Sequence, residues 1–224
     1  MIWIRLLCLA VGYCFGAIQT AFFYGKLKGI DIREHGSGNA GTTNTLRVLG
    51  TKAGLIVFAG DMLKSILAIV LVRLIFKGIC PDALPLLCLY TGAGCVLGHN
   101  FPFYMNFKGG KGIASTGGIM IAMHWLYVPV GLVVFFGTFF LTHYVSLGSL
   151  LLYLTFFVET VVLGELGIYG VTREILIEMY IIVFLLTVMA YWKHRGNISR
   201  LIHGNERKTY LSHKNQEKAK EENK

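Results

Sequence analysis

Long apolar stretches, separated by short polar or glycine-rich ones, constrain the fold of this chain more than any other feature of its sequence. Hydrophobic residues make up 54% of the 224 residues and charged residues 15%, which leaves too little polar surface to cover a soluble globule. Apolar runs of this kind are typical of membrane-spanning helices. We therefore predict an all-α, polytopic transmembrane helical bundle of about seven spans. The apolar runs cover residues 3–25, 53–76, 84–97, 113–123, 126–141, 149–163 and 175–192.

The stretch 113–141 allows two interpretations. It is long enough for one tilted helix, but it carries His124 and Trp125 near its middle and Pro129 just after them. These residues favour two short helices that turn near His124, because they interrupt the apolar run and proline removes a helical hydrogen bond. A single long helix remains the alternative.

Lysines and arginines indicate how the bundle lies in the membrane, because cytoplasmic loops carry an excess of them. With the N-terminus outside, the basic loops 26–52 and 98–112 and the basic chain end all lie on the cytoplasmic side. The other side keeps little beyond Lys77 and Arg173. We therefore predict that the N-terminus lies outside and the C-terminus lies in the cytoplasm.

The net charge of +9 could suggest binding to nucleic acid, but many of the basic residues gather from Lys193 onward, beside an apolar run. A cytoplasmic flank that faces anionic lipid explains this pattern better. We predict the lipid bilayer as a partner and no nucleic acid. The chain divides into a single membrane domain, residues 1–204, and a polar cytoplasmic tail, residues 205–224.

The first motif is the loop that reads GSGNAGTTN and leads to Arg47. Three glycines within six residues let successive backbone N–H groups point into one concavity, while hydroxyl and amide side chains add donors or cap a helix starting near Asn44. Arg47 would lie about one turn into that helix, within reach of a phosphate. A flexible turn is the alternative, but it needs no such side chains. The candidate phosphate-binding residues here are Gly36, Gly38, Asn39, Gly41, Thr42, Thr43, Asn44 and Arg47.

The second motif reads GHNFP and then FKGGKG, at the mouth of an apolar run. Lys108 and Lys111 flank a Gly-Gly pair, which again describes a phosphate-sized anion site. A P-loop is excluded because Gly112 stands where that motif needs Ser or Thr, and no strand precedes it. Ordinary flanking charge for the lysines and a capping or core role for His99 remain alternatives. The further phosphate-binding candidates are His99, Gly109, Gly110 and Gly112.

Two shorter motifs lie later in the chain. Ser146 falls in YVSLGS, between two apolar runs, where a helix-packing serine is the alternative to phosphate binding. His194 and Asn197 follow the last run and would share one helix face with Leu201. Within the second run, Asp61 and Lys64 lie three residues apart, and we interpret them as a structural pair that anchors the site.

Several kinds of catalytic site are missing from the sequence. The predicted cytoplasmic loops hold only the carboxylates Asp31, Glu34 and Glu206. These are too few to indicate a two-metal site for phosphoryl transfer. No histidine is followed by an acid five residues later, and no nucleophile elbow is present. The five cysteines show no metal-ligand spacing. We therefore predict no metal and no cofactor, and a chemistry that anion binding and positioning can deliver.

Three long stretches resemble one family, the bacterial acyl-phosphate:glycerol-3-phosphate acyltransferases, or PlsY family. They read DIREHGSGNAGTTNTLRVLG, GHNFPFYMNFKGGKGIAST and HRGNISRL with Glu206, in the family's order, and the resemblance covers nearly the whole chain. Asp61 and Lys64 also fall where the family has an Asp and a Lys. Ala40 departs from the family, which often has Pro or Ile there. The residues that the resemblance marks as catalytic are Ser37, Lys108, Lys111, His194 and Asn197.

The resemblance implies a function: transfer of a fatty acyl group from acyl phosphate to the 1-hydroxyl of sn-glycerol 3-phosphate, giving lysophosphatidic acid and phosphate. It implies a multi-pass enzyme of the bacterial inner membrane, with its active site facing the cytoplasm and no obligate protein partner. An anion transporter or channel is the alternative. A pore needs polar residues through the whole depth of the membrane, and beyond Asp61 and Lys64 the apolar runs offer few.

Overall fold

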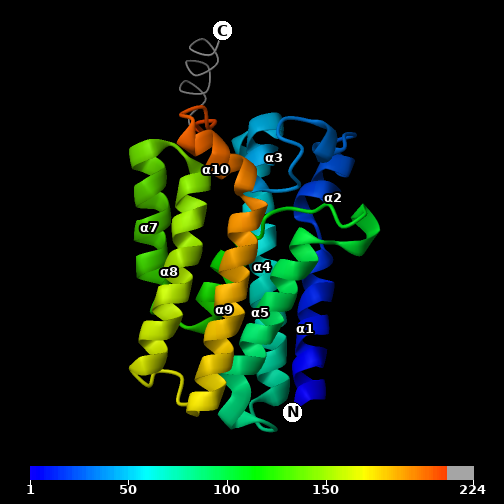
Figure 1. The fold of residues 1–224 in the computed structure, drawn as a ribbon. Coiled ribbons are helices and arrows are strands. Elements are labelled where there is room, and N and C mark those ends of the chain that lie inside the picture. The colour runs from blue at the N-terminus through cyan, green and yellow to red at the C-terminus, as the bar shows by residue number, and fades with distance from the viewer. Residues whose placement is uncertain (211–224) are drawn as a thin grey trace.

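The computed structural model describes residues 1–210, and over these residues the chain is helical without strands. The long helices stand side by side, and the short helices α3 and α10 lie together at the end opposite the N-terminus (Figure 1). The prediction of an all-α bundle is confirmed. The helices are α1 (Ile2–Ala17), α2 (Thr20–Leu27), α3 (Thr42–Leu49), α4 (Thr51–Phe76), α5 (Leu84–Asn100), α6 (Ile113–Met123), α7 (Tyr127–Thr142), α8 (Val145–Glu165), α9 (Arg173–Lys193) and α10 (Arg195–Ile202).

Five segments of the described chain are helical, long and apolar enough to cross a membrane. Two further apolar helices, α6 and α7, are shorter, so seven spans and the orientation of the termini stay predictions. The five segments are Ile2–Leu27, Thr51–Phe76, Pro81–Met105, Val145–Glu165 and Arg173–Lys193.

The stretch 113–141 forms two helices, as the sequence favours. Helix α6 ends at Met123, His124 has extended backbone (φ −160°, ψ 140°), and α7 begins at Tyr127. Pro129 lies in the first turn of α7, where its missing N–H costs no helical hydrogen bond. The break places the two helices on separate paths, and α7 packs against α8.

Glycines bring α1 and α5 into direct backbone contact. A Cβ atom on Gly16 would lie 2.1 Å from the carbonyl oxygen of Cys95, and one on Gly94 would lie 2.1 Å from that of Leu9. Close approach through small residues is a usual way for membrane helices to associate. Because α1 holds α5 in this way, the end of α5 that carries His99 has a fixed position next to the polar loops.

Residues 205–210, which begin the predicted polar tail, lie against the bundle, and we call them the C-terminal strap. The Asn205 N–H donates to the carbonyl of Arg200 at 2.9 Å, and the Thr209 N–H donates to the carbonyl of His143 at 2.9 Å. The Thr209 side chain is buried. The strap therefore joins α10 to the corner between α7 and α8, while residues 211–224 lie outside the described residues.

Candidate functional site

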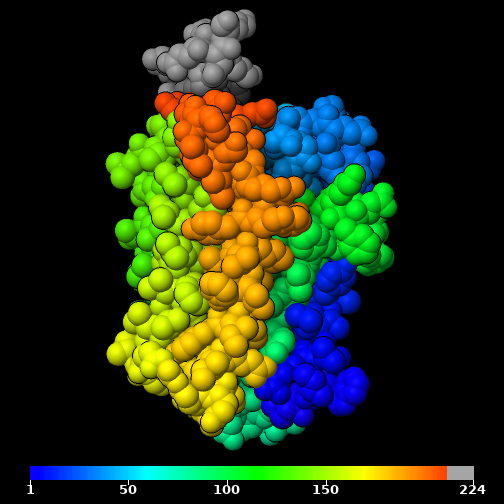
Figure 2. Space-filling view, viewed as in Figure 1, coloured from blue at the N-terminus to red at the C-terminus, as the bar shows by residue number. Residues whose placement is uncertain are grey.

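A cavity of about 680 Å³ lies where α3, α10 and the strap meet. In the space-filling view, α10 and the strap (orange-red) cover the same end of the molecule as the segment that contains α3 (blue) (Figure 2). The cavity lining comes from six parts of the chain. They are residues 36–47, residues 54–61 of α4, His99 at the end of α5, residues 111–114, residues 135–149 around the corner between α7 and α8, and the segment 193–209.

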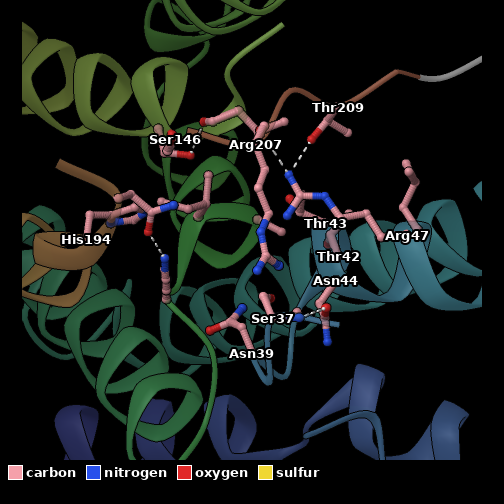
Figure 3. A pocket seen from close by; sticks show the side chains of 18 of the residues that line it. Ser37, Asn39, Thr42, Thr43, Asn44, Arg47, Ser146, His194, Arg207 and Thr209 are labelled. Atoms are coloured by element: carbon pink, nitrogen blue, oxygen red, sulfur yellow. Dashed lines mark hydrogen bonds between the residues drawn. The ribbon is translucent and has the colours of Figure 1, made fainter. Parts of the chain in front are cut away.

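The glycine-rich loop takes its shape from Asn44. The Asn44 side-chain oxygen accepts the Ser37 N–H at 2.8 Å, and its NH₂ group donates to the carbonyls of Ile32 and His35, each at 3.0 Å. Gly36 has a φ of +63°, and a Cβ there would lie 2.4 Å from the Asn44 oxygen. Asn44 is buried, so its amide holds the loop that presents Ser37 to the cavity (Figure 3).

Helix α3 begins two residues earlier than we predicted, and no side chain caps it. Its first residue is Thr42, and the N-cap residue is Gly41. The N–H groups of the first turn have no partner within a helix, so those of Thr42 and Thr43 are available at the cavity. The Thr42 hydroxyl is buried without a hydrogen-bond partner. The helix start and this hydroxyl therefore offer hydrogen-bond donors to the cavity.

Arg47 lies in the last turn of α3 because the helix starts at Thr42, and not one turn after a start near Asn44. One terminal nitrogen of its guanidinium donates to the Thr209 hydroxyl at 2.7 Å and to the Arg207 carbonyl at 3.2 Å. Arg47 lines the cavity, and Figure 3 shows its side chain directed to the strap. The guanidinium therefore lies at the boundary between α3 and the strap.

The two lysines of the second motif have different positions. Lys111 lines the cavity and donates a hydrogen bond to the side-chain oxygen of Asn197. Burial lowers the pKa of Lys111 to about 8, so the ammonium is mainly charged at pH 7. Lys108 is exposed and does not line the cavity, because the chain turns away through Asn106 and Phe107, both of which have positive φ.

Gly109 and Gly110 pack on the end of α5 and do not line the cavity. A Cβ on Gly109 would lie 2.1 Å from the carbonyl oxygen of His99, and one on Gly110 would lie 2.1 Å from His99 Nε2. The close approach of the loop to His99 explains both glycines. Gly112, with a φ of +80°, does line the cavity and lets the chain turn into α6.

Asp61, Lys64 and His99 form a buried polar cluster at the wall of the cavity. The Lys64 ammonium donates to Asp61 Oδ1 at 2.8 Å and to the carbonyl of Ile18 at 2.8 Å, and lies 2.9 Å from His99 Nδ1. The Thr20 hydroxyl also donates to Asp61, at 2.9 Å. The side chains of Asp61 and Lys64 thus pair as expected, and Asp61 and His99 line the cavity.

His194, at the junction of α9 and α10, and Asn197 of α10 line the cavity. His194 Nδ1 lies 2.8 Å from the carbonyl of Ala190. A carbonyl only accepts, so Nδ1 carries the proton and Nε2 of the neutral ring is free to accept a hydrogen bond. Burial, followed by the charge of Lys111, lowers the pKa of His194 to about 4, and the ring is therefore neutral at pH 7.

Glu206 connects three parts of the site, and we gave it no separate role from the sequence. Its Oε1 accepts from the Ser146 hydroxyl at 2.9 Å and from the Asn197 amide at 2.7 Å, and its Oε2 accepts from Arg200 Nε at 2.7 Å. Burial raises the pKa of Glu206, but these hydrogen bonds and the Arg200 charge together lower it. The ionised carboxylate therefore fixes Asn197, which in turn accepts from Lys111. Its place in the third signature was the only sequence signal for this role.

An apolar wall borders the polar groups, and the sequence analysis did not identify it. Phenylalanines of an apolar helix look alike in sequence whichever face of the helix they occupy. The apolar side chains that line the cavity come mainly from α4 and α7. They are Leu46, Leu55, Phe58, Ile113, Phe135, Phe136, Phe139 and Val145.

Positive charge exceeds negative charge around the cavity. The carboxylates in its lining are Asp61 and Glu206, and both are already hydrogen-bonded. A surface of this kind attracts anions. The cations in the lining are Arg47, Lys111, Lys193, Arg195, Arg200 and Arg207.

Comparison with known proteins connects this site to a family. Residues 6–204 match the family model described as glycerol-3-phosphate acyltransferase. The chain is 41% identical over 206 residues to the glycerol-3-phosphate acyltransferase of Bacillus subtilis (strain 168), covering 90% of this chain and 96% of that protein. This chain belongs to the glycerol-3-phosphate acyltransferase family.

Other relatives agree with this membership. Glycerol-3-phosphate acyltransferase 2 of Bacillus cereus (strain ATCC 10987 / NRS 248) is 40% identical over 210 residues, which cover 93% of this chain and 96% of that protein. The crystal structure of PlsY (YgiH), an integral membrane glycerol 3-phosphate acyltransferase, in its glycerol 3-phosphate form, superposes with a TM-score of 0.77 and 32% identity. That match covers 92% of this chain and 96% of the other. A second structure of that enzyme is its lysophosphatidic acid form, with a TM-score of 0.76.

The family match also divides the site. The glycine-rich loop, Lys111, His194 and Asn197 lie within residues 6–204, which the family model matches, whereas Glu206, the last residue of the third signature, lies beyond them. The C-terminal strap lies beyond residue 204. Glu206, Arg207 and Thr209 therefore line the cavity from outside the residues that the family model matches.

Proposed function

We propose that this protein transfers a fatty acyl group from acyl phosphate to the 1-hydroxyl of sn-glycerol 3-phosphate, and releases lysophosphatidic acid and inorganic phosphate. One observation supports this most: the cavity joins a cationic end to an apolar wall. Both substrates carry phosphate, and one of them also carries a long acyl chain. Such a pair of substrates needs both kinds of surface in one place.

Glycerol 3-phosphate binds at the cationic end, with its phosphate at Arg47 and the N–H groups that begin α3. The acyl chain of the donor lies along Phe135, Phe136 and Phe139 on α7, where burial of apolar surface stabilises it. Lys111 contacts the donor phosphate. Holding the two substrates in one cavity supplies much of the rate enhancement, because it replaces a collision of two molecules by a reaction within one complex.

The reaction proceeds by attack of the hydroxyl oxygen on the carbonyl carbon of the acyl phosphate. The oxyanion that forms on the former carbonyl oxygen is stabilised by backbone N–H groups and by the Lys111 ammonium. The bond from the carbon to the phosphate oxygen then breaks, and phosphate leaves with its electron pair. No covalent enzyme intermediate is needed, since phosphate is a good leaving group.

His194 Nε2 accepts a hydrogen bond from the attacking hydroxyl and orients it. The hydroxyl proton passes to the departing phosphate, which is a stronger base than an imidazole with a pKa of about 4, because a phosphate has a second pKa near 6. Ser37 lies across the cavity, and its hydroxyl contacts the reacting groups. A catalytic role for Lys108 rests on the sequence alone.

The sequence-based topology completes the proposal: seven spans, the N-terminus outside, and the cavity facing the cytoplasm of a bacterial inner membrane. This arrangement places the cavity where water-soluble glycerol 3-phosphate is available. It also places the apolar wall beside lipid, from which the acyl donor can enter.

A donor comparison tests the proposal. Purified protein in detergent is given glycerol 3-phosphate with either palmitoyl phosphate or palmitoyl-CoA. We expect lysophosphatidic acid and inorganic phosphate in equal amounts from the first donor and much less product from the second. Equal or better use of palmitoyl-CoA, or no transfer from palmitoyl phosphate, would contradict the proposal.

A further inference from the structure

The C-terminal strap brings one more cation to the cavity, Arg207, which lies outside the family match. Two other residues of the strap, Glu206 and Thr209, are held on either side of Arg207. Glu206 accepts three hydrogen bonds from side chains of α8 and α10, and Thr209 is buried with hydrogen bonds to His143 and Arg47. The Arg207 carbonyl itself accepts from Arg47. The backbone at Arg207 is therefore held in place.

The side chain of Arg207 extends from this fixed backbone into the cavity, toward the loop that carries Ser37 and Asn39 (Figure 3). The next residue of the strap, Lys208, is exposed like Arg207 but does not line the cavity. The positions of the two side chains differ although the residues are adjacent. Arg207 is thus the cation of the strap that an occupant of the cavity would meet.

Arg47 and Arg207 place two guanidinium groups near each other. Burial and then the charge of Arg207 lower the pKa of Arg47, which shows that the two charges are close enough to repel. The Glu206 carboxylate offsets part of this repulsion, but its oxygens already accept hydrogen bonds from α8 and α10, and Asp61 is bound to Lys64. A doubly charged phosphate between the two guanidinium groups would relieve it, and each planar group offers paired donors.

We infer that Arg207 is a second phosphate-binding residue for glycerol 3-phosphate, delivered by the strap and acting together with Arg47. This inference rests on the proposed function. Glycerol 3-phosphate is the better occupant of this position, because the donor's acyl chain must lie along the phenylalanines of α7, whereas the strap crosses the polar end. The strap thereby sets the affinity for the acceptor through residues that the matched family region does not include.

The test measures the KM values of both substrates for the wild-type protein and four variants. Arg207→Ala and Arg207→Gln remove the charge, the second with a long side chain retained, and Arg207→Lys keeps a charge without the planar fork. Lys208→Ala is the matched control, because it removes one positive charge from the next residue of the strap. Thermal unfolding of each variant in detergent checks that the fold is intact.

We expect Arg207→Ala and Arg207→Gln to raise the KM for glycerol 3-phosphate roughly tenfold, in line with the loss of one charge-assisted hydrogen bond at a partly exposed site. The kcat and the KM for palmitoyl phosphate should change less than about twofold, as should all constants of Lys208→Ala. Arg207→Lys should recover part of the affinity.

Three results would overturn the inference. They are an unchanged KM for glycerol 3-phosphate in both neutral variants, an equal rise in Lys208→Ala, and a rise confined to palmitoyl phosphate. In each of these cases an active wild-type protein leaves the proposed function intact. A wild-type protein that transfers nothing from palmitoyl phosphate would instead contradict the proposed function itself, and the inference with it.

Discussion

Asn44 and Gly110 show how one residue of a binding motif can serve the fold. The Asn44 amide makes its hydrogen bonds with the backbone of the glycine-rich loop. Gly110 lets the loop of the second motif pack on His99. The sequence indicated that these residue types belong to an anion site. It could not indicate their partners, because an amide or a glycine acquires its role only from the atoms that the folded chain places around it. The sequence analysis did not identify Arg207 as a cavity residue for the same reason.

The Lys111 ammonium should impose an upper pH limit on catalysis. Its pKa of about 8 is lowered from the usual value, so the charge is present below that pH and is lost as the pH rises through it. We expect kcat/KM for palmitoyl phosphate to fall above about pH 8, since this constant reports the free enzyme. Lys111→Arg should remove the fall, because arginine stays charged. Lys52→Arg, an exposed control away from the cavity, should keep it. An unchanged profile in Lys111→Arg would assign the limit to another group.

Some helix boundaries and contacts were predicted from the sequence and others were not. The difference is whether a feature depends on local residues or on contacts with distant ones. The break between α6 and α7 follows from local chemistry at His124 and Pro129, so the sequence could indicate it. The start of α3 at Thr42 depends on how Asn44 is held by the preceding loop, and the prediction placed it two residues late. The contact between α1 and α5 depends on which helices are neighbours, which a single sequence does not state.

The contact between α1 and α5 should be sensitive to one methyl group. In Gly94→Ala the new Cβ would meet the carbonyl of Leu9, so the helices must separate, at a cost of about 1–3 kcal/mol. Gly117 of α6 has no such neighbour within 4 Å, and Gly117→Ala should be neutral or slightly stabilising. Thermal unfolding in detergent compares them. Equal Tm values for the two variants would mean that the close contact contributes little to stability.

At the scale of the whole molecule, the bundle gathers polar segments from residues 36–47, 111–114 and 193–209 at one end. The distribution of basic residues predicted that these motifs share one side of the bundle. Most of the cationic residues of the site could therefore be predicted from the sequence. The apolar half could not be predicted, because the direction of each phenylalanine on α7 is set by packing against α8. The strap was also missed, since a polar chain end gives no periodic signal.

The reaction should not depend on a divalent metal ion. Among residues 1–210, no group of three or more His, Cys, Asp or Glu side chains could hold one, and the phosphate-binding donors are cations and N–H groups. We expect the initial rate with palmitoyl phosphate to remain within about twofold when EDTA is added. A loss that added Mg²⁺ restores, with the substrates kept soluble, would show that a metal ion takes part.

The most direct measurement of the central claim is a crystal structure of this protein with glycerol 3-phosphate. The claim is that the glycine-rich loop, α3 and the strap form one phosphate site in the 680 Å³ cavity. We predict that the phosphate lies within hydrogen-bond distance of Arg47 and of the N–H groups that begin α3, with the 1-hydroxyl toward His194. A phosphate bound instead at the smaller cavity lined by Arg73 and His124, with the large one unoccupied, would contradict the account.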